Sequence, residues 1–70
     1  MPDFRGQVTK FDDVQGLRAS DTGKALLCLI GEEEVWIPQS QIDDESEVYE
    51  PGGEGVLVVS QWIAEEKGLV

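Results

Sequence analysis

The amino-acid sequence predicts a mainly β fold, a small five-stranded SH3-like or OB-like barrel that ends in a short C-terminal helical turn. Two observations lead to this prediction. Short runs of β-branched and other apolar residues recur along the chain, and clusters of Gly, Asp, Ser and Pro separate them at short intervals. A closed barrel also leaves no exposed sheet edge, which is a hazard for so small a sheet. At 70 residues, the chain is expected to form one domain, residues 1–70, with a small core.

The first three strands are expected at residues 4–11, 16–20 and 24–30. The turn-like sequence DDVQG separates the first from the second, and SDTGK separates the second from the third. The third run, KALLCLI, is apolar on both faces, as is typical of a central strand that is covered on both sides. Its single cysteine, Cys28, is expected to be a buried apolar residue, and a lone cysteine excludes an internal disulfide.

The fourth strand, residues 34–38, is expected to form a hairpin with the third across the loop GEEE. A four-residue loop pairs apolar residues on one face of this hairpin: Ile30 with Val35, and Cys28 with Ile37. Trp36 then shares the opposite face with Leu27 and Leu29. Pro38 has no N–H to donate to a ladder, so the strand is expected to end there.

The final strand follows the sharp turn PGGEG and runs through VLVV to Val59. Ser60 is a suitable N-cap, and Gly68 a suitable stop, for about two helical turns over QWIAEEKG. Pattern alone leaves Trp62 open between strand and helix, and the capping residues favour the helix.

The charge of the chain is strongly acidic and unevenly placed. Asp and Glu number 15 against 5 Lys and Arg, which gives a formal net charge of −10. Residues 1–24 balance four acids with four bases, whereas residues 25–70 hold eleven acids and one base, Lys67. Such a chain is repelled by nucleic acid and by anionic membranes, so its favoured partners are basic proteins or cations.

Nothing in the sequence predicts membrane insertion or export. The longest apolar run, residues 25–30, is far shorter than the about 20 residues that a membrane-spanning helix needs. The start of the chain, MPDFRGQ, lacks the basic and apolar regions of a signal peptide. We therefore expect a cytoplasmic protein without membrane partners.

Catalysis is not expected, because the groups that it needs are missing. The chain has no histidine, so Cys28 lacks the usual activating base. The PGGEG turn is not followed by the lysine and helix of a phosphate-binding loop. We therefore predict no enzyme activity, no catalytic residues and no cofactor.

The acidic sequence DDESE carries oxygen ligands of the type that calcium prefers. Its spacing does not follow that of an EF-hand loop, which alternates its acids around a central glycine. We predict a solvated acidic loop and no metal site, and a bound cation is the alternative left open.

The candidate binding site is the acidic segment between residues 32 and 54, which holds nine acids and no bases. Its carboxylates could imitate the spaced phosphates of a nucleic acid backbone and attract a basic groove on a partner. The alternative is that they only keep a small protein soluble. Trp36 is expected inside, with the carboxylates around it pointing outward. The predicted partner-binding residues are Glu32, Glu33, Glu34, Asp43, Asp44, Glu45, Glu47 and Glu50.

A second candidate surface consists of aromatic residues that could stack on the bases of a single strand, as in single-strand-binding barrels. These residues are Trp36, Tyr49 and Trp62. The basic residues that would hold the phosphates are Arg5, Lys10, Arg18 and Lys24. We expect instead that both tryptophans pack in the core of a chain with few bulky residues.

Two sequences, EVWIPQSQI and GEGVLVVSQWIAEEKGL, resemble short phage and prophage-type proteins. Those proteins share a Trp-aliphatic-Pro-x-Ser-Gln core, a Gly-x-Leu-Val-Val strand and an Ala-Glu-x-Lys-Gly-Leu ending. The matching residues are Trp36, Ile37, Pro38, Ser40, Gln41, Gly55, Leu57, Val58, Val59, Ala64, Glu65, Lys67, Gly68 and Leu69. The resemblance covers roughly the last 45 residues, and such proteins often carry a lysine where this chain has Gln39. It implies an origin in a mobile element and no particular activity.

The leading hypothesis joins the acidic segment to this resemblance. It describes a small non-enzymatic binding protein of phage or mobile-element type that inhibits or modulates a basic, nucleic-acid-handling host protein, for example as an anti-CRISPR or other anti-defence inhibitor. Under this hypothesis the protein does not contact nucleic acid directly. The alternative is an accessory module of phage DNA replication or recombination that contacts single-stranded nucleic acid through aromatic residues. A structural or oligomerising domain is the third hypothesis, and the oligomeric state is left open.

Overall fold

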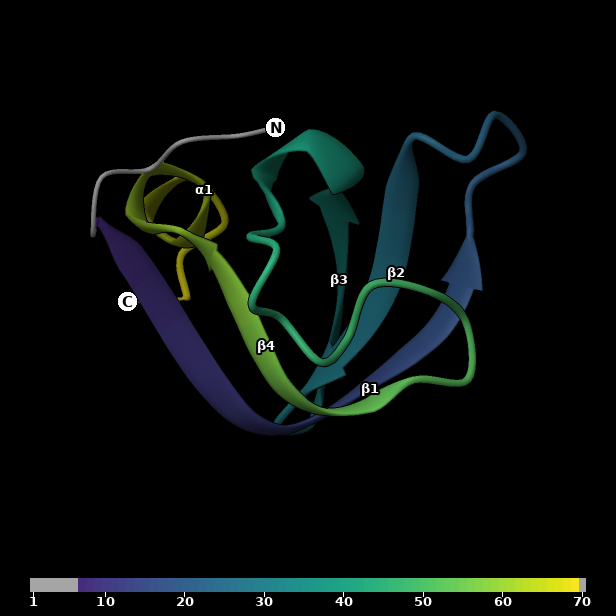
Figure 1. Cartoon of the computed structure of the whole chain (residues 1–70), viewed down its shortest axis with the longest axis horizontal. Coiled ribbons are helices and arrows are strands. Elements are labelled where there is room, and N and C mark those ends of the chain that lie inside the picture. The colour runs from purple at the N-terminus through teal and green to yellow at the C-terminus, as the bar shows by residue number, and fades with distance from the viewer. Residues whose placement is uncertain (1–6, 70) are drawn as a thin grey trace.

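The computed structural model describes residues 7–69, which form one strongly curled antiparallel sheet followed by a short helix (Figure 1). The order of the four strands across the sheet is β3-β2-β1-β4. The mainly β prediction is therefore confirmed, but the closed five-stranded barrel is wrong. The elements are β1 (Val8–Ala19), β2 (Ala25–Ile30), β3 (Glu33–Pro38), the 3₁₀ helix η1 (Gln39–Gln41), β4 (Glu54–Ser60) and α1 (Gln61–Glu66).

The five expected strands become four because β1 is one long bent strand. The sequence DDVQG, expected to be a turn, lies inside it. Phe11 pairs with Leu57 and Val14 with Gly55, so β1 has one residue more than β4 over this stretch. Asp13 lies within this bulge and has φ 56°, a left-handed conformation that Asp tolerates better than most residues. The bulge bends β1, which pairs with β4 on one side and with β2 on the other. Residues 4–6 of the expected first strand lie outside the described part of the chain.

The β2–β3 hairpin forms as expected, but with a shorter loop. Cys28 pairs with Val35 and Leu26 with Ile37, so the predicted register is wrong by two residues. The loop contains only residues 31–32, and Gly31, at φ 63°, fits the first central position of a type II′ turn. Because side chains alternate with a period of two, this shift leaves every side chain on its predicted face.

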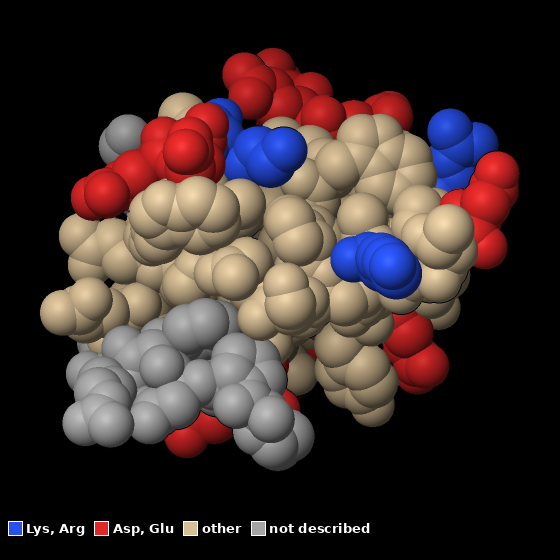
Figure 2. Space-filling model, turned by 90° about the horizontal axis from the view of Figure 1, so that it is seen from above, with Lys and Arg blue, Asp and Glu red and all other residues tan. Residues whose placement is uncertain are grey.

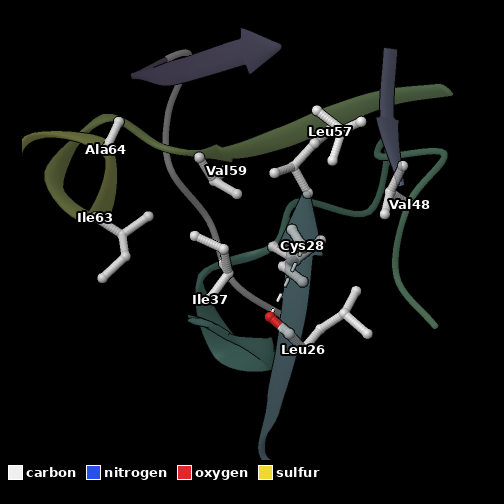
Figure 3. Packing of buried hydrophobic residues seen from close by; sticks show 10 residues of the cluster. Leu26, Cys28, Ile37, Val48, Leu57, Val59, Ile63 and Ala64 are labelled. Carbon is white, nitrogen blue, oxygen red and sulfur yellow. Dashed lines mark hydrogen bonds between the residues drawn. The ribbon is translucent and has the colours of Figure 1, made fainter. Parts of the chain in front are cut away.

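The core fills the concave side of the curled sheet, where side chains from all four strands, α1 and the segment before β4 converge (Figure 3). Cys28 is buried there, as expected. It donates a hydrogen bond from Sγ to the Leu26 carbonyl oxygen at 3.7 Å, and burial raises the pKa of its thiol to about 11. A thiol with so high a pKa remains protonated at neutral pH and is a poor nucleophile. The buried cluster consists of Val14, Leu26, Cys28, Ile37, Ile42, Val48, Leu57, Val59, Ile63 and Ala64.

The expected C-terminal helix is confirmed, with both of its ends capped. At the start, Ser60 Oγ accepts a hydrogen bond from the Ile63 N–H at 3.2 Å. At the end, the N–H of Gly68 donates to the Glu65 carbonyl at 3.1 Å, and the N–H of Leu69 to the Ala64 carbonyl at 2.8 Å. Trp62 therefore lies on a helix. No helix within residues 7–69 has the length and apolar character required to cross a membrane.

Candidate protein-binding surface

The β3–β4 connection, residues 42–53, carries most of the predicted acidic site and runs along the free edge of β4. The N–H of Asp43 donates to the Val58 carbonyl at 2.8 Å, and the N–H of Glu47 to the Val56 carbonyl at 2.9 Å. Ile42 also forms an isolated bridge with Val59. The connection thus covers the edge of β4 without forming a regular strand, and it fixes the position of its acidic side chains.

The buried side chain of Ser46 anchors the connection to β4. Its side chain is 5% exposed, and its hydroxyl donates to the Val48 carbonyl at 2.8 Å. The same oxygen accepts hydrogen bonds from the N–H of Val58 at 3.1 Å and from the N–H of Val48 at 3.2 Å. This role was not predictable from local sequence, because a serine within an acidic run is typical of a solvated loop.

Two of the predicted partner-binding carboxylates stabilise the connection itself. Asp43 Oδ1 accepts a hydrogen bond from the N–H of Glu45 at 2.9 Å, an arrangement that closes an Asx-type turn. Glu47 Oε1 accepts one from the N–H of Val56 at 2.9 Å and so pairs a second amide at the edge of β4. These carboxylates have intramolecular partners, whereas Asp44 and Glu45 project as exposed side chains between them.

The remaining predicted residues lie apart from that turn. Glu32, Glu33 and Glu34 are exposed at the tip of the β2–β3 hairpin and the start of β3, and Glu50 is exposed further along the connection. The structure therefore places the predicted site on two separate elements. In the view from above, most of the visible acidic side chains lie around the edge of the molecule, whereas basic side chains lie both on the face and at its edge (Figure 2).

One row of side chains links the hairpin to β4 across the outer, convex face of the sheet. Glu34 lies opposite Leu29, Leu29 opposite Gln15, and Gln15 opposite Glu54. The row has a carboxylate at each end, separated by three strand spacings of about 4.8 Å, or about 14 Å along the curved sheet. Glu54 is the last acid of the predicted acidic segment but is not one of the predicted partner-binding residues, although its place at the start of the final strand was an available signal.

The expectation that the tryptophans pack in the core is wrong. Trp36 is 37% exposed and Trp62 is 58% exposed. The concave side is filled by aliphatic side chains, and Trp36 lies on the opposite face with Leu27, as the alternation predicted. Leu27 also lies opposite Arg18, whose guanidinium carbon is 5.8 Å from the centre of the Trp36 ring. This cation–π contact partly covers a large aromatic side chain on the outer face.

A hollow of about 320 Å³ opens beside the exposed Tyr49 and has both carboxylates and apolar surface in its wall. The amide of Gln39 donates to the Tyr49 backbone carbonyl at 3.2 Å and ties η1 to this part of the connection. An aromatic ring beside two carboxylates complements an ammonium or guanidinium group. The hollow is lined by Gln39, Ile42, Asp43, Asp44 and Tyr49.

Within the described part of the chain, no group of three or more His, Cys, Asp or Glu side chains is arranged to hold a metal ion. Fold and surface together define a small curled-sheet module with exposed aromatic and acidic groups on its outer face. Comparison of the chain with family models, with curated proteins and with solved structures found no match.

Proposed function

We propose that the protein is a non-enzymatic acidic binding module of phage or mobile-element type, which acts in the cytoplasm and inhibits or modulates a basic, nucleic-acid-handling host protein. One observation carries the proposal: the exposed Trp36 and the carboxylate of Glu34 lie on the same outer face of β3, two residues apart. Tryptophan is enriched among residues that dominate interface energies, and a charged rim steers and orients a partner.

The acidic groups support binding to a basic surface in a second way. The net charge of −10 attracts a positively charged partner over several ångströms and accelerates association at low salt. The hydrogen bonds of Ser46 and Glu47 hold the connection in place, so its exposed carboxylates need little ordering on binding. The hollow beside Tyr49 can receive a single lysine or arginine side chain of the partner.

The concrete form of the proposal is an anti-defence inhibitor, such as an anti-CRISPR protein. CRISPR effectors hold their nucleic acid in a positively charged channel, which an acidic module can block by charge complementarity. The resemblance of the sequence to phage-type proteins supports this form.

One observation favours a second candidate function, an accessory role in phage DNA replication or recombination. Arg18 lies over the exposed ring of Trp36, and an aromatic residue beside a guanidinium is a pair that can bind a base and its phosphate. Under this alternative, Arg18→Glu or Lys24→Glu weakens binding of a single strand. Under the leading proposal, the same substitutions have little effect on binding of a basic partner.

The experiment that separates the two functions is capture of partners from host lysate by the tagged protein. It is carried out at low and high salt, with and without nuclease. The leading proposal predicts a basic, nucleic-acid-handling protein that is captured at low salt, released at high salt and indifferent to nuclease. Capture that disappears with nuclease contradicts it and supports the single-strand alternative.

A further inference from the structure

The two edges of the sheet differ in whether other parts of the chain cover them. The β3–β4 connection covers the edge of β4 with backbone and side-chain hydrogen bonds. At the other end of the strand order is β3, which pairs with β2 alone. Among residues 7–69, no backbone hydrogen bond is made along the outer edge of β3. An uncovered edge is a template for another strand.

The register identifies the backbone groups at this edge. In a hairpin with a two-residue loop, the closing pair, here Ile30 and Glu33, exchanges backbone hydrogen bonds, and every second pair along the ladder does the same. The N–H of Gln39 donates to the Lys24 carbonyl at 2.8 Å, which continues this alternation beyond Pro38. The N–H groups of Glu34 and Trp36 therefore point away from β2, toward the open edge.

We propose that the outer edge of β3 receives an extended, basic segment of the partner as an additional strand. This inference rests on the proposed function, because it states how the acidic module holds its basic partner. Backbone hydrogen bonds to Glu34 and Trp36 supply affinity that is independent of side chains, and alternate side-chain contacts supply specificity. Pro38 has no N–H, so it limits the donors of this edge to a short stretch.

Charge complementarity identifies the occupant. Glu33 and Glu34 are exposed on β3, and Glu32 lies in the adjoining loop. Lysine or arginine residues on an added strand would be their cross-strand neighbours, which is a stabilising arrangement. A second copy of the chain would instead bring another set of these glutamates and another charge of −10 to the same edge. A basic partner segment is therefore the occupant that the edge favours.

A pair of substitutions at one position separates the backbone from the charge. Glu34→Pro removes the outward N–H and the carboxylate but no hydrogen bond to β2, and proline is accepted in edge strands. Glu34→Gln removes the carboxylate and keeps the N–H. The probes are an eight-residue peptide of alternating Lys and Val, and a Lys-Pro peptide of the same charge that adopts polyproline II and lacks half of the ladder donors.

We expect the Lys-Val peptide to bind the wild-type protein about tenfold more tightly than the Lys-Pro peptide. Glu34→Gln is expected to weaken Lys-Val binding a few-fold, and Glu34→Pro about tenfold beyond that. If the two peptides bind equally and the two variants behave alike, strand addition is wrong but charge-driven binding stands. If neither peptide binds at low salt, the proposed function fails as well.

Amide hydrogen exchange of the wild-type protein provides a test that needs no variant. Lys-Val peptide is expected to slow exchange of the Glu34 and Trp36 amides, while the exchange of the Val58 amide, already bonded to Ser46, stays unchanged. Unchanged exchange of both β3 amides in the bound state overturns the proposal. Protection of these amides that rises with protein concentration, without peptide, also overturns it, because the edge is then occupied by a second copy.

Discussion

The hydroxyl of Ser46 accepts a hydrogen bond from the backbone N–H of Val58 at 3.1 Å, between two residues twelve positions apart. This hydrogen bond satisfies the Val58 N–H, which points outward from the edge of β4 and would otherwise need a partner on a neighbouring strand. It also fixes the acidic connection against the sheet. Stability of the fold and presentation of the carboxylates therefore depend on the same serine.

Removal of this hydroxyl is expected to be costly. Ser46→Ala leaves the buried N–H groups of Val48 and Val58 without their partner, and a buried unsatisfied group costs about 1–3 kcal/mol of the free energy of unfolding. Urea unfolding followed by circular dichroism measures the loss. Ser40→Ala, at an exposed position, is the control and should stay within about 0.5 kcal/mol of wild type. Equal stability of the two variants contradicts the role given to Ser46.

Close backbone packing at Gly16 gives a second prediction. The N–H of Gly16 donates to the Gly53 carbonyl at 2.8 Å, and a Cβ at Gly16 would lie 2.6 Å from the Glu50 carbonyl oxygen. Gly16→Ala must push the connection away from β1, so we expect a loss of about 1–3 kcal/mol in the free energy of unfolding. Gln15→Ala, at the exposed neighbouring position, should change it by less than about 0.5 kcal/mol. Thermal unfolding of both variants checks the difference. An unchanged Tm for Gly16→Ala would show that the contact between Gly16 and the Glu50 carbonyl is not tight.

The buried thiol predicts a pH dependence. Burial raises the pKa of Cys28 to about 11, so the unfolded chain loses this proton before the folded chain does. The stabilising effect is fully present below the ordinary thiol pKa and is lost as the pH rises toward 11. Unfolding free energies of wild type and Cys28→Ala, measured from pH 7 to pH 11, should converge over that window. Parallel profiles for the two proteins would contradict the raised pKa.

Much of the fold follows from local sequence signals. Alternation assigned the side chains of β2 and β3 to the correct faces, and Ser60 and Gly68 marked the ends of the helix. The continuous course of β1 could not be predicted from local sequence, because an Asp-Asp pair is typical of both a turn and a bulge. Pairing of β1 with two different strands decides between them, and that pairing is a long-range property.

The candidate surface also depends on long-range contacts, which limited its prediction from the sequence. Alternation placed Trp36 on one face of the hairpin with Leu27, but both faces of β2 are apolar, so the sequence could not show whether that face would be concave or convex. The burial of Ser46 and the bonds of Glu47 arise only when the connection returns to the edge of β4. The predicted site therefore combines carboxylates that stabilise the fold with others whose side chains are exposed and available to a partner.

The exposure of Trp36 separates stability from binding. Ile37→Ala, at the adjacent buried position, should lower the free energy of unfolding by about 2–5 kcal/mol. Trp36→Ala should lower it by only about 1 kcal/mol, since the ring lies outside the core, yet weaken partner binding about tenfold or more. Denaturation and titration calorimetry with the captured partner measure the two effects. A Trp36→Ala protein that binds normally would remove the aromatic anchor from the proposal.

The central claim is that the position of the carboxylates, and not net charge alone, binds a basic partner. The most direct test is the affinity of the captured partner for two double variants with equal charge, Glu33→Gln/Glu34→Gln on β3 and Glu65→Gln/Glu66→Gln on α1, at several salt concentrations. We predict that the β3 pair weakens binding about tenfold at low salt, with a difference that shrinks as salt rises, while the α1 pair stays within about twofold of wild type. Equal weakening by the two pairs, or none by either, would contradict the claim.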